Sequence, residues 1–362
     1  MHLVPPSPLA KRSLGLLLVA LLLLTLTASC ERTVPVHNGR FLAFGTLVDL
    51  SIIGVSRERA EEATRLLEQD FLHLHQEWHA WEEGTLTWVN RQLASGEPFE
   101  APEVVLPMIE LGRMLSVNSD HLFNPAIGKL VDLWGFHSSD PGGHRPPNPE
   151  QIARLVQANP RMTDIHSDGP TLRCDNPDVK LDFGAFGKGY GINRAIARLR
   201  DLGIDNAIVN AGGDLRAIGT RAGRPWRIAI RNPSGSGVLA TIDLSGDESI
   251  FTSGDYERNF THQGTRYHHI IDPRSGYPAR GTRSVTVLHT DAAVADAAAT
   301  ALFIAGPERW HELAQRLCLR YVLLVAEDGV LHINPAMERR IKLLVDNLEI
   351  RVSPPLVPVV GR

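Results

Sequence analysis

The 362-residue sequence contains few of the features that mark common functional sites. It has three cysteines, and Cys174 and Cys318 lie far apart, outside any Cys-x-x-Cys arrangement, which argues against a zinc site or a disulfide framework. We expect these two to be buried thiols, with a single disulfide between them in an oxidising compartment as the alternative. A formal net charge of -4 and the lack of a basic run argue against nucleic acid as a partner. What is present, 43% hydrophobic and 22% charged residues, is typical of a globular protein with a large core.

The one long apolar run lies at the N-terminus. A basic pair precedes the mostly apolar residues Leu14 to Leu26, a stretch too short for a stable membrane span. Small residues then lead to Cys30 in an order that resembles a bacterial lipobox. We therefore expect a lipoprotein signal peptide over residues 1–29, a tether over residues 30–39, and a lipid anchor on Cys30 at the periplasmic side of the bacterial cell membrane. A plain secretory signal is the main alternative, and an uncleaved signal anchor is a second.

The rest of the chain predicts one catalytic body over residues 40–335, followed by a C-terminal tail over residues 336–362. "RFLAFGTLVDLSII" indicates a strand pair joined by a turn at Gly45-Thr46. Apolar residues at helical spacing predict a helix over residues 58–79, and a second helix is expected over residues 103–116. Further on, "WRIAIRNP" predicts a strand, whereas Ser253-Gly254-Asp255 and Gln263-Gly264 are typical of turns.

The stretch "DFGAFGKGYGIN", residues 182–193, combines glycines, a lysine and a carboxylate as phosphate-binding loops do. It is not a P-loop, because only two residues separate Gly184 from Gly187 and Gly189 stands where the hydroxyl residue belongs. It is not a dinucleotide fingerprint either, because Ile192 takes the place of the third glycine. A protein kinase is excluded, since the chain has no His-Arg-Asp catalytic loop.

The pattern around this stretch predicts the order strand, tight turn, helix, strand. Val179, Leu181 and Phe183 alternate with polar residues, as in a half-buried strand, and "NAIVN" predicts the next strand. Asp182 would then end a strand. Lys188 would lie near a helix N-terminus, where backbone amides favour anions.

A later alanine-rich segment, "TDAAVADAAATALFIAG", predicts a helix. Asp296 and Thr300 are four residues apart and therefore share one face of it. Both offer the hard oxygen ligands that Mg²⁺ prefers, although such a pair is more often a cap, a back-bonded hydroxyl or a solvated face. His268 and His269, adjacent in a strand, should point to opposite faces, one to the site and one to solvent.

Seven motifs occur in order along the chain: "AFGT", "FNPAIGKLVDLWGF", "DFGAFGKGYGIN", "NAGGDLRAIG", "TSGDYERNF", "HHIIDPRSGYP" and "ADAAATALFIAG". Together they strongly resemble the ApbE family of FAD:protein FMN transferases over about Arg40 to Val330. The resemblance implies a mixed α+β or α/β fold with two lobes, in which mixed sheets pack with helices and the flavin site lies between the lobes.

The resemblance also implies an activity. Members use Mg²⁺ and FAD to move FMN onto a threonine or serine hydroxyl of a target protein, such as a subunit of a membrane redox complex, and AMP leaves. Some relatives instead hydrolyse FAD to FMN and AMP. An FAD pyrophosphatase and a non-catalytic flavin-binding lipoprotein therefore stay open as alternatives.

Carried over by motif, the implied site residues fall into three groups. The metal ligands would be Asp296, Thr300 and the backbone carbonyl of Ala185, and the catalytic side chains Asp296, Lys188 and His269, the last accepting a proton from the acceptor hydroxyl. The flavin nucleotide would contact Phe44, Trp81, Leu122, Phe123, Asn124, Asp182, Lys188 and Ile271.

Two motifs depart from the family pattern. Asn124 and Ala126 stand where many members have aspartate and threonine, which removes a carboxylate and a hydroxyl from that part of the pocket. Gly187 replaces a common alanine before the lysine, a change expected to affect the stiffness of the turn more than its chemistry.

Overall fold

The structure is a computed structural model that describes residues 34–137 and 145–357. The expected signal peptide and the anchor residue Cys30 lie outside the described residues, as does most of the tether. Among the described residues, no helix is both long enough and apolar enough to cross a bilayer. From Val36 onward the chain forms one compact unit, which begins four residues before the expected boundary.

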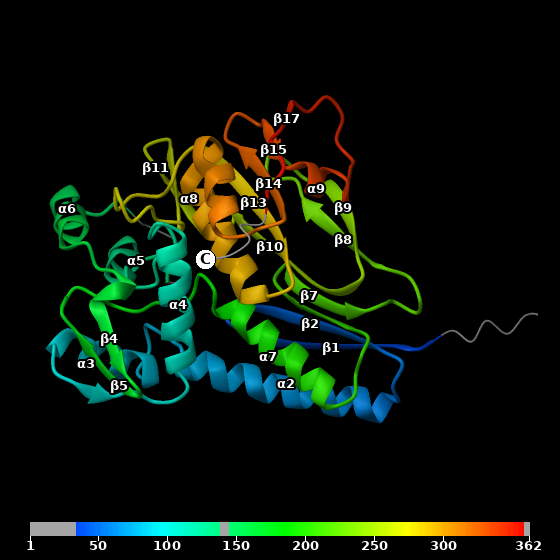
Figure 1. Ribbon diagram of the computed structural model, residues 1–362, viewed down its shortest axis with the longest axis horizontal. Coiled ribbons are helices and arrows are strands. Elements are labelled where there is room, and N and C mark those ends of the chain that lie inside the picture. Colours follow the sequence, from blue (N-terminus) through cyan, green and yellow to red (C-terminus); the bar gives the residue numbers. More distant parts are fainter. Residues whose placement is uncertain (1–33, 138–144, 358–362) are drawn as a thin grey trace, which may run out of the picture. The chain divides into compact units, whose positions relative to one another are not determined.

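A nine-stranded sheet forms the centre of this unit (Figure 1). Its strand order is β1-β2-β6-β7-β10-β13-β14-β15-β17, and every neighbouring pair is antiparallel except β15 and β17. Antiparallel neighbours beside separate helices make this an α+β fold, as expected. The strands are β1 (Val36–Ala43), β2 (Thr46–Ile53), β6 (Ala207–Ala211), β7 (Asp214–Gly219), β10 (Gly246–Gly254), β13 (Thr282–His289), β14 (Tyr321–Ala326), β15 (Leu331–Ile333) and β17 (Ile350–Val352).

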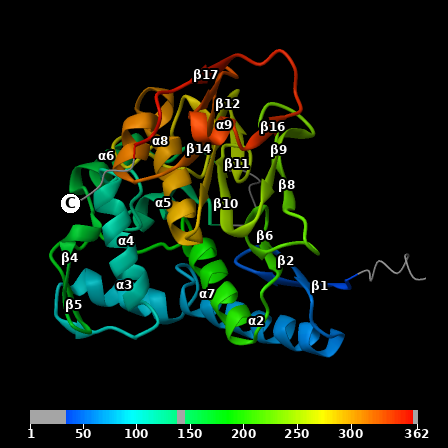
Figure 2. The ribbon, with the colours of Figure 1, turned by 45° about the vertical axis from the view of Figure 1, so that its right-hand side comes forward.

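Helices cover one face of the sheet, and Figure 2 shows α8 lying along it with α7 and α2 below. The opposite face packs against a small sheet of order β16-β9-β8, with a separate apolar cluster between the two sheets. The helices are α2 (Arg57–Glu77), α3 (Thr85–Ser95), α4 (Leu106–Asn118), α5 (Gly128–Trp134), α6 (Pro149–Ala158), the 3-10 helix η1 (Met162–Asp164), α7 (Gly187–Asp201), α8 (Ala292–Arg316) and α9 (Pro335–Glu338).

Three smaller sheets complete the described fold. The first is β16-β9-β8, the second is β3-β5-β4 beside the helices α3 and α4, and the third is the hairpin β11-β12. Their strands are β3 (Phe99–Glu100), β4 (Ile165–Asp168), β5 (Thr171–Cys174), β8 (Trp226–Arg231), β9 (Val238–Leu244), β11 (Asn259–His262), β12 (Thr265–His268) and β16 (Ile341–Leu343).

The first hairpin turns one residue earlier than the sequence predicted. Phe44 and Gly45 occupy the turn, with φ of 51° and 69°, and Ala43 pairs with Thr46. Two successive residues with positive φ match the right-handed twist of the strands that they join. Glycine adopts this geometry freely, whereas phenylalanine does so at a cost, so packing must hold Phe44 in place.

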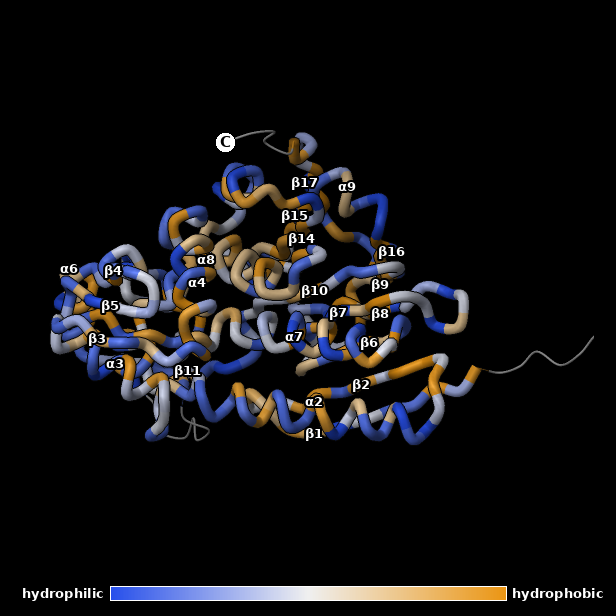
Figure 3. Tube along the Cα trace, turned by 60° about the horizontal axis from the view of Figure 1, so that its bottom comes forward, coloured by the Kyte–Doolittle hydropathy of each residue, from blue (hydrophilic) through white to orange (hydrophobic). Residues whose placement is uncertain are grey.

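Helix α2 matches its predicted range within two residues at each end. Ser56 caps it by accepting a hydrogen bond from the Arg59 amide, and its buried residues recur every three or four positions. Figure 3 shows the resulting alternation of hydrophilic and hydrophobic residues along the helix. The apolar stripe packs on β1 and α7, which places the C-terminal end of α2 beside the Phe44 turn.

Helix α8 begins at a strong cap and lies very close to α7. Asp291 accepts hydrogen bonds from the amides of Ala293 and Val294, at 2.9 and 3.1 Å. A Cβ atom added to Gly189 of α7 would lie only 2.3 Å from the carbonyl oxygen of Ala292. The alanine-rich sequence of α8 and the glycine of α7 thus allow two backbones to approach, which brings side chains of both helices together.

The predicted strand over residues 179–183 was wrong, because this segment is extended but forms only one isolated bridge, between Lys180 and Ile127. The backbone of this segment forms its hydrogen bonds with loop carbonyls and with the side chain of Asn90 instead. The amides of Lys180 and Asp182 donate to the loop carbonyls of residues 126 and 125. The side chain of Asn90 both accepts from the Leu181 amide and donates to its carbonyl. The alternating burial that suggested a strand is real, since Val179, Leu181 and Phe183 are all buried.

Three further expectations need correction. The segment 253–254 ends strand β10 and is not a turn, whereas the turn at Gln263-Gly264 is confirmed. The expected tail beyond residue 335 instead supplies β16 and β17, which pair with β9 and β15, so the folded unit extends further than predicted. Cys174 is buried as expected, but the free Cys318 is exposed at the end of α8.

Candidate functional site

Lys188 and Asp214 form an ion pair at the junction of α7 and the central sheet. Lys188 is the second residue of α7, and Asp214 is the first residue of β7, directly after a Gly-Gly turn. The other carboxylate oxygen of Asp214 accepts a hydrogen bond from the Thr252 amide at 2.9 Å. Burial alone would lower the pKa of Lys188, but the charges of Asp214 and Asp296 outweigh this effect and raise it to about 12. The ammonium group is therefore permanently charged.

Asp296 completes this centre from helix α8. Its carboxylate is only 7% exposed and accepts a hydrogen bond from the Gly189 amide at 3.0 Å. Burial and the neighbouring charge of Asp214 raise the pKa of Asp296 above its usual range, against the opposing effect of Lys188. A carboxylate of this kind favours an additional cation beside it.

The carbonyl of Ala185 is available as a ligand for such a cation. In a regular helix the Gly189 amide would donate to the carbonyl four residues earlier, which is that of Ala185, but here it donates to Asp296. Within the described part of the chain no other group donates to this carbonyl. The hydrogen bond from the Gly189 amide therefore orients Asp296 and leaves the Ala185 carbonyl without its usual helical donor.

Thr300 lies one helical turn from Asp296, as predicted. Its hydroxyl is 3.2 Å from the hydroxyl of Ser253 on β10, so two hydroxyl oxygens lie together at this point. With the carboxylate of Asp296 and the carbonyl of Ala185, they provide the hard, neutral or singly charged oxygens that suit Mg²⁺. Among the described residues, no group of three or more His, Cys, Asp or Glu side chains is arranged to hold a metal ion.

His269 lies beside the same centre, with its ring partly exposed. Its amide donates to the Arg258 carbonyl at 3.0 Å, and its Nδ1 lies 3.3 Å from the same oxygen. Desolvation, with the charges of Arg258, His268 and Lys188, lowers the pKa of His269 well below 6.5. Its ring is therefore neutral near pH 7 and able to accept a proton.

His268 takes a different position from the expected one. Its ring does not face solvent but is buried against Phe303, with ring centroids 5.4 Å apart. Its Nε2 lies 2.9 Å from the Ala279 carbonyl, and its Nδ1 accepts from the Ile270 amide at 3.3 Å. His268 thus has a structural role.

Asp182 precedes the start of α7, where its carboxylate accepts a hydrogen bond from the Gly184 amide at 2.8 Å. Desolvation raises the pKa of Asp182, while the nearby charges of Arg258, Lys180 and His137 oppose that rise. The side chain thus closes the tight turn that presents Ala185 and Lys188.

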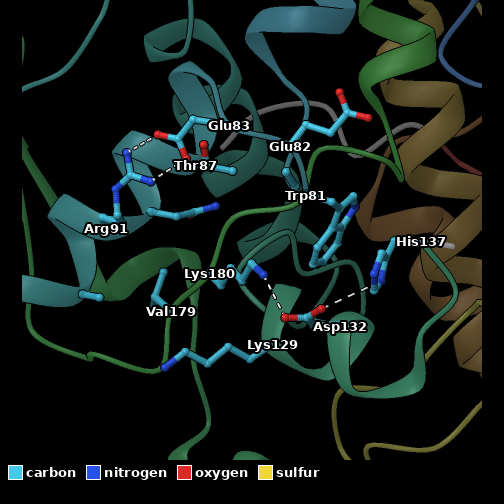
Figure 4. Close-up of a pocket in the computed structure, with 13 residues that line it drawn as sticks. Trp81, Glu82, Glu83, Thr87, Arg91, Lys129, Asp132, His137, Val179 and Lys180 are labelled. Carbon is cyan, nitrogen blue, oxygen red and sulfur yellow. Dashed lines mark hydrogen bonds and ion pairs between the residues drawn. The ribbon is translucent and has the colours of Figure 1, made fainter.

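Trp81 lines a separate cavity of about 460 Å³ (Figure 4). Its ring stacks on His137 with centroids 4.5 Å apart, and the Lys180 ammonium lies 4.2 Å from the ring centroid. Asp132 pairs with that ammonium at 3.0 Å. His137 and Lys180 thus already contact the Trp81 ring, and the contact of Trp81 with a flavin nucleotide stays a prediction. None of Lys188, Asp214 and Asp296 lines this cavity.

Phe44 lies over the first turns of α7. Its ring packs with Phe71 and Trp78, at centroid distances of 5.5 and 6.3 Å, and leaves no room for a side chain at residue 191, which is glycine. These contacts keep the residue in its positive-φ turn. Phe44 is half-buried, so part of its ring is exposed near the glycine-rich helix start.

Four other expected flavin contacts belong to the core or to its framework. Leu122 and Phe123 are 2% and 1% exposed, and Ile271 is 4% exposed. Asn124 is also buried: it donates to the Pro160 carbonyl and accepts from the Ala126 amide. Their side chains are therefore packed inside the protein, and their contact with the flavin stays a prediction. An aspartate at position 124 could not make the donating bond, which explains the asparagine.

Three residues near the site were not predicted from the motifs. Asp214, Ser253 and Arg258 had been quoted within "NAGGDLRAIG" and "TSGDYERNF" but had been assigned no role. The pairing of β10 with β7 places Asp214 and Ser253 beside the site. A polar residue directly after Gly-Gly, at the start of a strand, was the available signal for Asp214.

The geometry so far combines hard oxygen groups, a buried carboxylate, a fixed ammonium group and a nearby aromatic cavity, an arrangement suited to nucleotide phosphates. The profile of the ApbE family matches residues 44–323. The chain belongs to the ApbE family.

Individual relatives agree with this assignment. The chain is 40% identical over 314 residues to the FAD:protein FMN transferase of Rhodobacter capsulatus, covering 85% of this chain and 59% of that protein. It is 32% identical over 319 residues to the enzyme of the same name from Vibrio cholerae, covering 86% of this chain and 94% of that protein.

Solved structures are also similar. The ApbE protein of Thermotoga maritima superposes with a TM-score of 0.78 at 29% identity, over 84% of this chain and 99% of that one. The apo flavinyl transferase ApbE of Pseudomonas stutzeri gives a TM-score of 0.74 at 28% identity, over 86% and 98% of the two chains.

Proposed function

We propose that this protein transfers FMN from FAD to a threonine or serine hydroxyl of a target protein. The acceptor oxygen forms a bond to the phosphorus on the FMN side of the diphosphate, the bond from that phosphorus to the AMP oxygen breaks, and AMP leaves. The names of the relatives support the substrate. The observation that carries the proposal is the buried Asp296 beside the ion pair of Lys188 and Asp214, where a diphosphate and a cation would meet.

Asp296, Thr300 and the Ala185 carbonyl would hold the Mg²⁺ ion. When bound, the ion would offset negative charge on the diphosphate. Lys188 would stay protonated and add a second positive charge, while Asp214 fixes its direction. His269, neutral near pH 7, would accept the proton of the acceptor hydroxyl as that oxygen attacks.

The remaining expectations concern the setting of the reaction. We propose that the acceptor is an extracytoplasmic protein, such as a subunit of a membrane redox complex. The protein itself would be held at the periplasmic side of the membrane by a lipid on Cys30, as the lipobox-like sequence indicates.

The test is an incubation of purified protein with FAD and a peptide that carries a Ser/Thr-Gly-Ala-Ser/Thr sequence, with Mg²⁺ or with a chelator. A transferase releases AMP and makes the peptide covalently fluorescent. AMP release without peptide labelling would instead indicate an FAD pyrophosphatase, and FAD binding without either product a flavin-binding protein.

The metal assignment is tested by the variant Asp296→Asn, which we expect to reduce Mg²⁺-dependent transfer by at least a hundredfold, because the one side-chain charge among the three ligands is lost. The matched control is Asp201→Asn, at the exposed end of α7. Unchanged activity in Asp296→Asn would contradict the assignment.

A further inference from the structure

The centre around Lys188 does not by itself carry a net positive charge. Its ammonium is paired with Asp214, and Asp296 adds a second carboxylate, so the three side chains together are anionic when ionised. A dinucleotide diphosphate carries two negative charges. Without a bound metal ion, this centre therefore does not attract the diphosphate, and a further cation of the chain would strengthen binding where the diphosphate enters.

Arg258 is placed to supply that charge. It lies between β10 and β11, the residue is exposed while its guanidinium is part-buried, and it forms no ion pair with any described carboxylate. One guanidinium nitrogen, Nη1, donates to the Phe136 carbonyl at 3.3 Å. The next residue, His137, stacks on Trp81. The guanidinium therefore lies beside the aromatic cavity with further N–H groups available.

The same residue also borders the catalytic centre. The Arg258 carbonyl accepts from the His269 amide at 3.0 Å and lies 3.3 Å from its Nδ1. Its positive charge acts on Lys188, Asp182 and His269, opposing protonation of the lysine and the histidine. Arg258 thus connects the aromatic cavity with the residues around the phosphate centre.

We propose that Arg258 binds the diphosphate of FAD between the Trp81 cavity and the Lys188 centre, and so distinguishes dinucleotide from flavins without phosphate. The planar guanidinium can form two parallel hydrogen bonds to phosphate oxygens, which a lysine cannot do in the same geometry. This inference rests on the proposed function, because it takes FAD as the substrate.

The test compares the affinities of FAD and riboflavin for the wild type, Arg258→Met and Arg258→Lys, by flavin fluorescence titration in the presence of a chelator. We expect Arg258→Met to weaken FAD binding at least tenfold and to leave riboflavin binding unchanged, with Arg258→Lys in between. The matched control is Arg224→Met, an exposed arginine in the turn between β7 and β8, which should change neither affinity.

Two outcomes would overturn the inference: unchanged FAD affinity in Arg258→Met, or an equal loss for FAD and riboflavin, which would indicate a structural role. The transferase assay separates this inference from the proposed function. Wild-type protein that binds FAD through Arg258 without producing AMP would contradict the proposed function and leave the inference standing. Wild-type protein that binds no FAD would overturn both.

Discussion

At the scale of single residues, two adjacent histidines acquire opposite properties from their surroundings. His269 is partly exposed and lies near the charges of Lys188 and Arg258, whereas His268 is enclosed and uses both ring nitrogens in hydrogen bonds to the backbone. The bond from the Ile270 amide requires an unprotonated Nδ1. Protonation would therefore break a hydrogen bond and bury a charge at the same time.

This arrangement predicts a pH-dependent stability. Burial, with the charges of Arg280 and Arg266, lowers the pKa of His268 from 6.5 to about 4. Because the unfolded chain binds the proton more readily, stability is lost as the pH falls below 6.5 and levels off near 4. The full effect is about 3 kcal/mol.

The measurement is urea unfolding of the wild type and His268→Gln at pH 7, 6 and 5. Glutamine can donate and accept as the neutral ring does but cannot titrate. We expect the wild type to lose about 2 kcal/mol more than the variant between pH 7 and 5. Parallel losses in both proteins would show that His268 is not the responsible group.

At the scale of elements, the site depends on the close approach of α7 and α8. The Gly189 amide reaches Asp296 only because no side chain separates the two helices at this point. Gly187, two residues earlier in the same helix, has ordinary space: its nearest neighbours to an added Cβ are 3.9 and 4.0 Å away. The close approach of α8 therefore requires glycine at position 189, whereas position 187 has room for a side chain.

We predict that Gly189→Ala lowers the free energy of unfolding by about 1–3 kcal/mol, because the added methyl group forces the helices apart. It should also reduce Mg²⁺-dependent transfer, since Asp296 moves away from α7. Gly187→Ala is the matched control, expected to change stability by less than about 1 kcal/mol. Chemical unfolding and the transfer assay measure both, and equal effects of the two substitutions would argue against the close-approach explanation.

At the scale of the whole molecule, the folded unit and its proposed membrane anchor are separate parts of the sequence. The compact unit begins at Val36, close behind the lipobox-like segment that ends at Cys30. A lipid on that cysteine would leave the first strand only a few residues from the bilayer surface, since an extended residue spans at most about 3.6 Å.

We predict that Cys30→Ala moves the protein from the membrane fraction of expressing cells to the soluble fraction or stops its export. Cys318→Ser is the matched control, because Cys318 is an exposed cysteine of the folded unit and its loss should leave membrane association intact. Membrane association that survives Cys30→Ala would contradict lipidation at this residue.

Local sequence patterns predicted the structure correctly where contacts within one short segment decide it. The helical spacing of apolar residues predicted α2 and the buried face of α7, and the spacing of Asp296 and Thr300 placed them on one face of α8. The resemblance of ordered motifs predicted the α+β fold and the family. Alternation failed at residues 179–183, because burial of alternate side chains does not require a neighbouring strand.

Only the tertiary structure decided which residues meet. Asp214 became a partner of Lys188, and Ser253 a neighbour of Thr300, because β7 and β10 pair beside the ends of two helices distant in sequence. The tertiary structure likewise placed Phe123 in the core and returned residues 336–352 to the sheets, where β16 and β17 pair with β9 and β15. By itself the sequence determined several elements, among them α2 and α7, and the family. Side-chain environments and long-range charge pairs depend on packing between distant segments, which no local pattern encodes.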